Sequence, residues 1–308
     1  TLLAQDGLVE HVERNVKLMQ PLQVVCQGIS QMDLLSLRRL LVVLDDGAEV
    51  SLLMVGRDGG DRHRMVSQVG EIFLGKGARL NMWCIDQEKA ETQTIDHLCF
   101  SQEEGSFLAF GNFSLQQGLL RRTLQVNQKG KAAQSQLFGG VIGHGAAHVD
   151  THLLMNHGAE GGQSDILYKY VLDDESTGAF AGKVRVQPDA QKINSLETNA
   201  NLCVSPQAHM FTQPMLEIYA DDVKCNHGST VGRMDERALF YMAQRGVPEA
   251  EGRMLLQEAF LGEEVTRVEH DILRERLNYW IEETFRRKAG HCVDCEICDT
   301  KKKIEKQA

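Results

Sequence analysis

Short runs of alternating apolar and polar residues fill most of this 308-residue chain. Between about residue 40 and residue 230, hardly any window carries the apolar stripe of a long amphipathic helix. The clearest strand-like runs occupy residues 78–85, 92–100, 106–115, 122–127 and 136–142. Alternation with a period of two places every second side chain on one face of a strand. The pattern therefore predicts a mainly β fold, with a β core at 37–233.

The first residues follow a less uniform pattern. Leu8, Val12 and Val16 recur at intervals of four, which is typical of a helix, and residues 22–30 then alternate like a strand. We therefore expect residues 1–36 to form an N-terminal segment of mixed helix and strand.

The clearest local turn signal lies between residues 40 and 55. Two apolar runs there flank the residues Asp45, Asp46 and Gly47. An Asp-Gly pair between two strand-like runs is typical of a β-hairpin. The sequence therefore predicts a hairpin with its turn at these three residues.

A slower rhythm accompanies the alternation in the second half of the core. Strand-like segments begin near residues 148, 164, 179, 198 and 215, at steps of roughly 15 to 20 residues. Each is followed by small or turn-forming residues. This spacing fits either an antiparallel β-sandwich or a parallel β-solenoid, in which each coil stacks on its neighbour. Periodicity alone does not choose between these folds.

Helical patterns replace the strand patterns near Met234. Asp235 is a suitable N-cap and Gly246 a suitable stop for the first helix. Three helices are expected, over residues 236–245, 249–261 and 264–288. They predict a small C-terminal helical domain at 234–288. The remaining residues, 289–308, have no apolar pattern with which to join a core, so we expect a mobile tail that contains cysteines.

Composition and missing motifs exclude several classes of protein. Acidic residues outnumber basic ones by 43 to 33 and no basic stripe is visible along the body of the chain, so nucleic-acid binding is not expected. No apolar run is long enough to cross a membrane. The eight cysteines are mostly scattered, which indicates reduced thiols of a cytoplasmic protein. Without a P-loop, a nucleophile elbow or a dinucleotide fingerprint, the chain is expected to have no nucleotide site of its own.

Cys225 and His227 are the strongest candidates for a functional site. They lie two residues apart in the stretch LEIYADDVKCNHGSTVG, at 216–232. In an extended strand both side chains leave the same face, with Cα atoms about 6.5–7 Å apart. A thiolate and an imidazole can share one iron, zinc or copper ion. The alternative is a small buried thiol beside a histidine in a turn.

Two weaker metal candidates are present. His148, Asp150 and His152 alternate, so they share one face of a strand and could bind a divalent ion, or they could form an ordinary solvent-facing ladder. The tail has the C-x2-C-x2-C spacing found in iron–sulfur ligation but lacks the fourth cysteine. Those three residues, which could equally be spare exposed thiols, are Cys292, Cys295 and Cys298.

Long stretches of the sequence carry a resemblance to a known family. HVDTHLLMNHG, LYKYVLDDESTGAFAGKVRVQPDAQKI, TNANL, LEIYADDVKCNHGSTVG and FYMAQRG follow one another over roughly residues 148–261. In order and spacing they resemble the SufB/SufD family of iron–sulfur cluster assembly proteins, and its SufD branch more than its SufB branch. The resemblance implies a right-handed parallel β-helix (a solenoid) with a small C-terminal helical domain. Because the family has a helical region ahead of its β core, we also expect a piece to precede Thr1.

The resemblance also implies a function. The chain is expected to be a scaffold subunit of the SUF system and not an enzyme, with an iron–sulfur cluster or iron bound transiently and only in the complex. Cys225 and His227 match the family position at the interface between two β-helix proteins. The implied partners are a SufB-like subunit and the SufC ATPase, with a homodimer as a possible form of the isolated chain. The residues expected to dock the ATPase are Glu236, Phe240, Tyr241, Arg245, Gly246, Leu255 and Phe260.

Two other functions are considered beside this one. A carbohydrate-active β-helix enzyme would need several carboxylates or basic residues along one solenoid face and, in general, a secretion signal, and neither is seen in the sequence. A stand-alone metal-binding protein would use the cysteines of the tail.

Overall fold

The computed structural model describes residues 4, 6–28, 31–58, 62–87, 89–116 and 118–288. The chain divides into two compact units, Thr1–Arg233 and Met234–Ala308. No helix in the described part is long and apolar enough to span a membrane. The predicted cysteine tail at 289–308, with Cys292, Cys295 and Cys298, lies outside the described residues.

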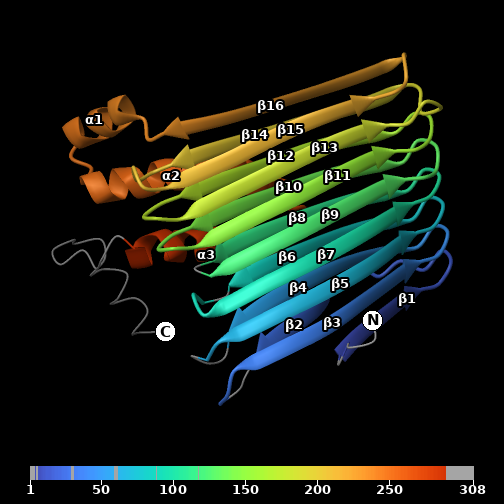
Figure 1. Cartoon of the computed structure of the whole chain (residues 1–308), viewed down its shortest axis with the longest axis horizontal. Helices are drawn as coiled ribbons and strands as arrows, with labels where there is room; N and C mark the ends of the chain where they lie inside the picture. Colours follow the sequence, from blue (N-terminus) through green and yellow to red (C-terminus); the bar gives the residue numbers. More distant parts are fainter. Residues whose placement is uncertain are drawn as a thin grey trace. The chain divides into compact units, whose positions relative to one another are not determined.

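The first unit is a parallel β-solenoid (Figure 1), so the predicted mainly β solenoid fold with C-terminal helices is confirmed. Odd-numbered strands form one sheet, sheet A, and even-numbered strands form the other, sheet B. Sheet A contains, in spatial order, β1 (Asp6–Val12), β3 (Leu34–Leu44), β5 (Arg64–Leu74), β7 (Thr92–Gln102), β9 (Leu119–Gln128), β11 (His148–His157), β13 (Thr177–Val186) and β15 (His209–Ile218). Sheet B contains β2 (Leu22–Gly28), β4 (Glu49–Asp58), β6 (Arg79–Gln87), β8 (Phe107–Gln116), β10 (Gln134–Gly143), β12 (Gln163–Leu172), β14 (Ile193–Cys203) and β16 (Val223–Arg233).

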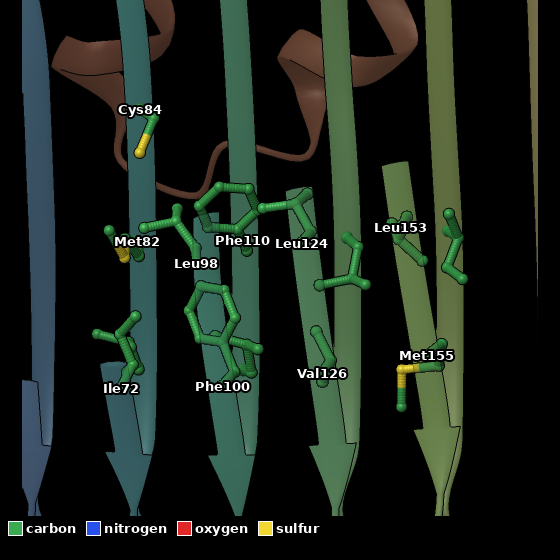
Figure 2. Close-up of a cluster of buried hydrophobic side chains, with 14 of the residues drawn as sticks. Ile72, Met82, Cys84, Leu98, Phe100, Phe110, Leu124, Val126, Leu153 and Met155 are labelled. Atoms are coloured by element: carbon green, nitrogen blue, oxygen red, sulfur yellow. The ribbon is translucent and has the colours of Figure 1, made fainter. Parts of the chain in front are cut away.

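Columns of apolar side chains fill the space between the two sheets. Parallel pairing brings the same inward position of each coil into register, so equivalent side chains stack from coil to coil. Figure 2 shows such stacks in the middle of the solenoid. In sheet B one column consists of Leu52, Met82, Phe110, Leu137 and Ile166. Each of these five side chains is at most 2% exposed, and this burial provides the main driving force for stacking.

The predicted hairpin at residues 40–55 is wrong. β3 pairs with β1 and β5, whereas β4 pairs with β2 and β6, so the two strands lie in different sheets. The Asp-Gly turn between them is a corner of the solenoid. Gly47 has a φ of +69°, and its N–H donates to the carbonyl of Lys76 in the next coil. The Asp-Gly pair therefore specified a sharp turn, but strand pairing between coils decided that this turn is a solenoid corner and not a hairpin.

The helix predicted around Leu8, Val12 and Val16 is also wrong, because residues 6–12 form strand β1. Positions i and i+4 share a face in a strand as well as in a helix. Pairing with β3 in parallel register resolves this ambiguity in favour of the strand, and Val12 is buried opposite Leu44. Residues 22–28 form β2, which continues the solenoid through its pairing with β4.

The second unit contains helices α1 (Glu236–Gln244), α2 (Glu249–Thr266) and α3 (Asp271–Lys288). The predicted N-cap is confirmed, since the Asp235 carboxylate accepts hydrogen bonds from the N–H groups of Arg237 and Ala238. α2 does not end before Gly262 as predicted, and α3 begins at Asp271 instead of near 264. A glycine inside a helix costs about 1 kcal/mol, and burial of Leu261 and Val265 on either side of Gly262 outweighs that cost.

Candidate functional site

The last coil of the solenoid contains Cys225 and His227. β16 is the last strand of sheet B and pairs with β14, and among the described residues no further strand lies beside it. Cys225 lies in register with Ser195, and His227 with Glu197. Because these pairs occupy alternate positions, all four side chains leave the same face of the sheet.

The two candidate ligands differ in exposure. Cys225 is half-buried and packs against the edge of the apolar core, whereas His227 is exposed. Burial raises the pKa of the Cys225 thiol above its ordinary value. A thiol with a raised pKa stays protonated at neutral pH unless a metal ion or another cation stabilises the thiolate. The geometry therefore offers a soft sulfur ligand and an imidazole on a strand with one free edge.

Glu197, below His227, was not predicted from the sequence. It is 0% exposed, and neither carboxylate oxygen has a hydrogen-bond partner among the described residues. Burial raises the pKa of this carboxyl from its ordinary 4.5 to about 7. Glu197 and His227 continue the column that holds Leu137 and Ile166 in earlier coils. The sequence signal was a charged residue at an inward position, which is visible only once the coils are aligned.

A neighbouring column at the same end of the solenoid is polar but satisfied. The Thr212 hydroxyl lies 2.7 Å from that of Ser229 and donates to Asn199 Oδ1 at 2.8 Å. Asn199 donates in turn to the backbone carbonyl of Tyr168, and Asn201 donates to Asn199 and to the carbonyl of Thr230. These polar groups satisfy one another, as buried polar groups in proteins usually do. Glu197 differs from them in having no such partner.

The second metal candidate has a different environment. His148, Asp150 and His152 alternate along β11, and the structure places Asp150 Oδ1 3.0 Å from His152 Nε2. Arg121 Nη1 lies 3.6 Å from the other oxygen of Asp150. A guanidinium therefore already supplies positive charge to this carboxylate. Within the described ranges, no three His, Cys, Asp or Glu side chains form a group that could hold a metal ion as they now stand.

The residues predicted to dock an ATPase lie on the surface of the helical unit. Phe240 and Tyr241 of α1 are 66% and 58% exposed, and Leu255 of α2 is 40% exposed. Arg245 stacks over the Tyr241 ring, with its guanidinium carbon 5.2 Å from the ring centroid. Large apolar side chains that remain in water are common at protein interfaces. Of the remaining positions, Glu236 and Gly246 are exposed and Phe260 is half-buried.

Sequence reasoning also missed a buried cluster of charged side chains, formed by Arg122, Asp86 and Asp96. Arg122 of β9 is 2% exposed and lies inside the solenoid. Its Nη1 is 3.0 Å from Asp86 Oδ2, and its Nη2 is 2.7 Å from Asp96 Oδ2. Ser114 adds a hydrogen bond to Asp86 at 3.3 Å. One guanidinium therefore compensates one of the two carboxylates, and burial raises the pKa of Asp96, which favours a proton on the other. The mutual contacts indicate a structural role.

Comparison with known proteins identifies the family to which this chain belongs. Residues 27–260 match the family model described as "SUF system FeS cluster assembly, SufBD core domain". An iron–sulfur cluster assembly SufBD family protein of Synechocystis is 28% identical over 88% of this chain, and this chain spans 62% of that relative's length.

Two relatives carry the name SufD. The iron–sulfur cluster assembly protein SufD of Escherichia coli is 34% identical over 42% of this chain and 30% of its own length. SufD of Bacillus subtilis is 22% identical over 89% of this chain and 63% of its own length. The resemblance to the SufB/SufD family, and to its SufD branch, is thereby confirmed. The chain belongs to the SufBD core family of the SUF system for iron–sulfur cluster assembly.

Proposed function

We propose that this chain is a non-catalytic scaffold subunit on which iron or an iron–sulfur cluster is held briefly during assembly. The observation that carries the proposal is the placement of Cys225 and His227 on β16, the last strand of its sheet. A soft ligand pair at the end of a solenoid can be completed by ligands from another protein. Iron or the cluster is cargo in this scheme, and the complex completes its coordination.

The proposed partner at this end is a second β-solenoid, a SufB-like subunit. β16 has backbone N–H and C=O groups on its free edge, and such an edge readily pairs with a strand of another protein. Large apolar residues are exposed around the last two coils, namely Leu196, Phe211, Tyr219 and Val231. A second copy of this chain would use the same edge if the isolated protein forms a homodimer.

The helical unit is the proposed dock for an ATPase of the SufC type. The exposed apolar side chains of Phe240, Tyr241 and Leu255 support this assignment. β16 ends at Arg233, and α1 begins at Glu236. A movement of α1 driven by ATP is therefore transmitted through two residues of chain to the strand that carries Cys225 and His227. This short connection supports an ATP-driven opening and closing of the site.

Alanine substitution of Cys225 or His227 tests the proposal. In cells that depend on this system, we expect either variant to reduce the activity of an iron–sulfur enzyme by about tenfold or more. Co-purification with the partner subunit and the ATPase should be retained, because two side chains on one strand contribute little to the whole interface. Thermal unfolding of the purified variants reports whether the fold is intact.

His97 and Cys99 provide a matched control. They have the same residue types, the same spacing of two and the same half-buried cysteine and exposed histidine, but they lie on β7 in the middle of sheet A. Alanine at these positions should leave cluster supply unchanged. Normal cluster supply from both Cys225→Ala and His227→Ala would contradict the proposal.

A further inference from the structure

Glu197 is placed where an unpaired carboxylate is costly. It is fully buried in β14, and both of its oxygens lack hydrogen-bond partners among the described residues. Burying an unpaired carboxylate has a large free-energy cost unless a proton or a cation neutralises it. The position is therefore suited to binding a cation.

The backbone places Glu197 next to the two ligand candidates of β16. It is the register partner of His227, and Ser195, two residues before it, is the partner of Cys225. Neighbouring strands are about 4.8 Å apart, and positions i and i+2 are about 6.5–7 Å apart. The Cα atoms of Cys225, His227 and Glu197 thus form a triangle whose three side chains leave one face of the sheet.

The opposite sheet leaves room for this carboxylate. In sheet A the inward column of Leu98, Leu124 and Leu153 changes to Gly182 in the coil of Glu197. A Cβ atom at Gly182 would lie only 1.9 Å from Glu197 Oε1. The side chain currently points toward this glycine, which explains why no metal-binding group of three is formed as the side chains now stand. A metal-bound arrangement therefore requires the Glu197 side chain to rotate away from Gly182 and toward His227, its register partner.

We propose that Glu197 is the third ligand of the Cys225–His227 site and that the site takes a divalent first-row transition metal of the ferrous type. A thiolate and a carboxylate balance the two positive charges, and the neutral imidazole completes a three-ligand set. A fourth position is left for a ligand from the partner subunit. The inference rests on the proposed function of the same site, and it adds a ligand from the strand below.

Cobalt titration of the full chain tests this ligand set. Cys292, Cys295 and Cys298 are changed to serine in every sample, since the tail thiols could bind the probe. Co²⁺ reports its ligands by absorption, with a thiolate charge-transfer band from cysteine and ligand-field bands that depend on coordination. We call the chain with these three serines the background. We expect the background to bind one Co²⁺ with both sets of bands, and we expect Cys225→Ser to remove the thiolate band.

Glu197→Gln is the decisive variant, because it keeps the shape of the side chain and removes the charge. We expect it to weaken Co²⁺ binding by roughly tenfold or more and to shift the ligand-field bands while the thiolate band remains. Glu217→Gln is the matched control. Glu217 lies on β15 of the last coil and pairs with Lys183, so its substitution should leave Co²⁺ affinity unchanged.

The possible results separate this inference from the proposed function. Equal Co²⁺ affinity and spectra for Glu197→Gln and its background would overturn the assignment of Glu197 as a ligand, and so would a background that binds no Co²⁺. Either result leaves the cellular effect of Cys225→Ala and His227→Ala as the separate test of the scaffold function. Loss of cobalt binding in Glu197→Gln, with native-like circular dichroism, supports the inference.

Discussion

Two buried charged groups inside the same solenoid have opposite environments. Arg122 is held by Asp86 and Asp96 at 3.0 and 2.7 Å, whereas Glu197 has no partner among the described residues. Both lie between the sheets, but Glu197 follows the apolar residues Leu137 and Ile166 in its column. Arg122 instead lies between the polar residues Asp96 and Thr151 of the adjacent coils. In the Arg122 cluster, each carboxylate has a cationic partner within the protein. The unpaired carboxylate lies one coil from the end, next to Cys225 and His227.

This difference shows how a structural charge can be distinguished from a candidate ligand. Buried charges are common in proteins when a partner compensates them, and they then contribute mainly to specificity of packing. An uncompensated charge reduces stability, so its presence beside two possible metal ligands is better explained by binding than by folding. Three experiments on stability sharpen the comparison.

The largest effect is expected for Arg122→Met. It leaves Asp86 and Asp96 buried without their common cation, and breaking a buried pair in this way costs about 3–5 kcal/mol. Denaturant unfolding measures the loss. Arg121→Met is the control, since the Arg121 side chain is 54% exposed and should contribute little. A stability for Arg122→Met close to that of the parent would show that the cluster is not a structural unit.

Glu197→Gln should have an intermediate effect on the free energy of unfolding, and it should stabilise the protein where Arg122→Met destabilises it. Because burial raises the pKa of Glu197 to about 7, the folded state binds this proton more tightly than the unfolded chain does. The stability contributed by this tighter proton binding is fully present below the unfolded pKa of about 4.5. It is lost as the pH rises to 7 and beyond. The loss by pH 8 is about 3 kcal/mol as an upper value.

The neutral variant should therefore be more stable than the parent at pH 8 and nearly equal to it near pH 4.5. Unfolding is measured across this range with a chelator present, so that metal binding does not contribute. An unchanged pH dependence in Glu197→Gln would mean that the carboxylate is compensated in the folded state.

The smallest effect is expected at Glu160, on the surface. Hydrogen bonds from Lys192 and Lys131 lower the pKa of Glu160, so any contribution to stability is present at neutral pH and is lost as the pH falls. Both lysines are well exposed, and water and salt screen such pairs. Glu160→Gln should thus be indistinguishable from the parent in thermal unfolding at moderate salt. A clear destabilisation would show that ion pairs along the corners do contribute to coil stacking.

Local sequence patterns were informative about elements and less so about their pairing. Alternation gave most strands of the core, and Asp235 correctly marked the start of α1. The Asp-Gly turn after β3 looked like a hairpin because turn chemistry is similar at a hairpin and at a solenoid corner. Leu8 and Val12 looked helical because a spacing of four fits both periods. In both cases, hydrogen bonds to the neighbouring coil determined the structure: a corner instead of a hairpin, and a strand instead of a helix.

The sequence by itself determined the alternation, the helical end of the chain, and the pairing of a cysteine with a histidine two residues later on one strand. Only the tertiary structure decided that this strand ends a sheet, and that Glu197 lies below His227 while Gly182 opposes it. The physical reason is that parallel stacking brings together residues about 30 positions apart, such as Glu197 and His227. Their register is fixed by the backbone hydrogen bonds between coils, and no local pattern contains that information.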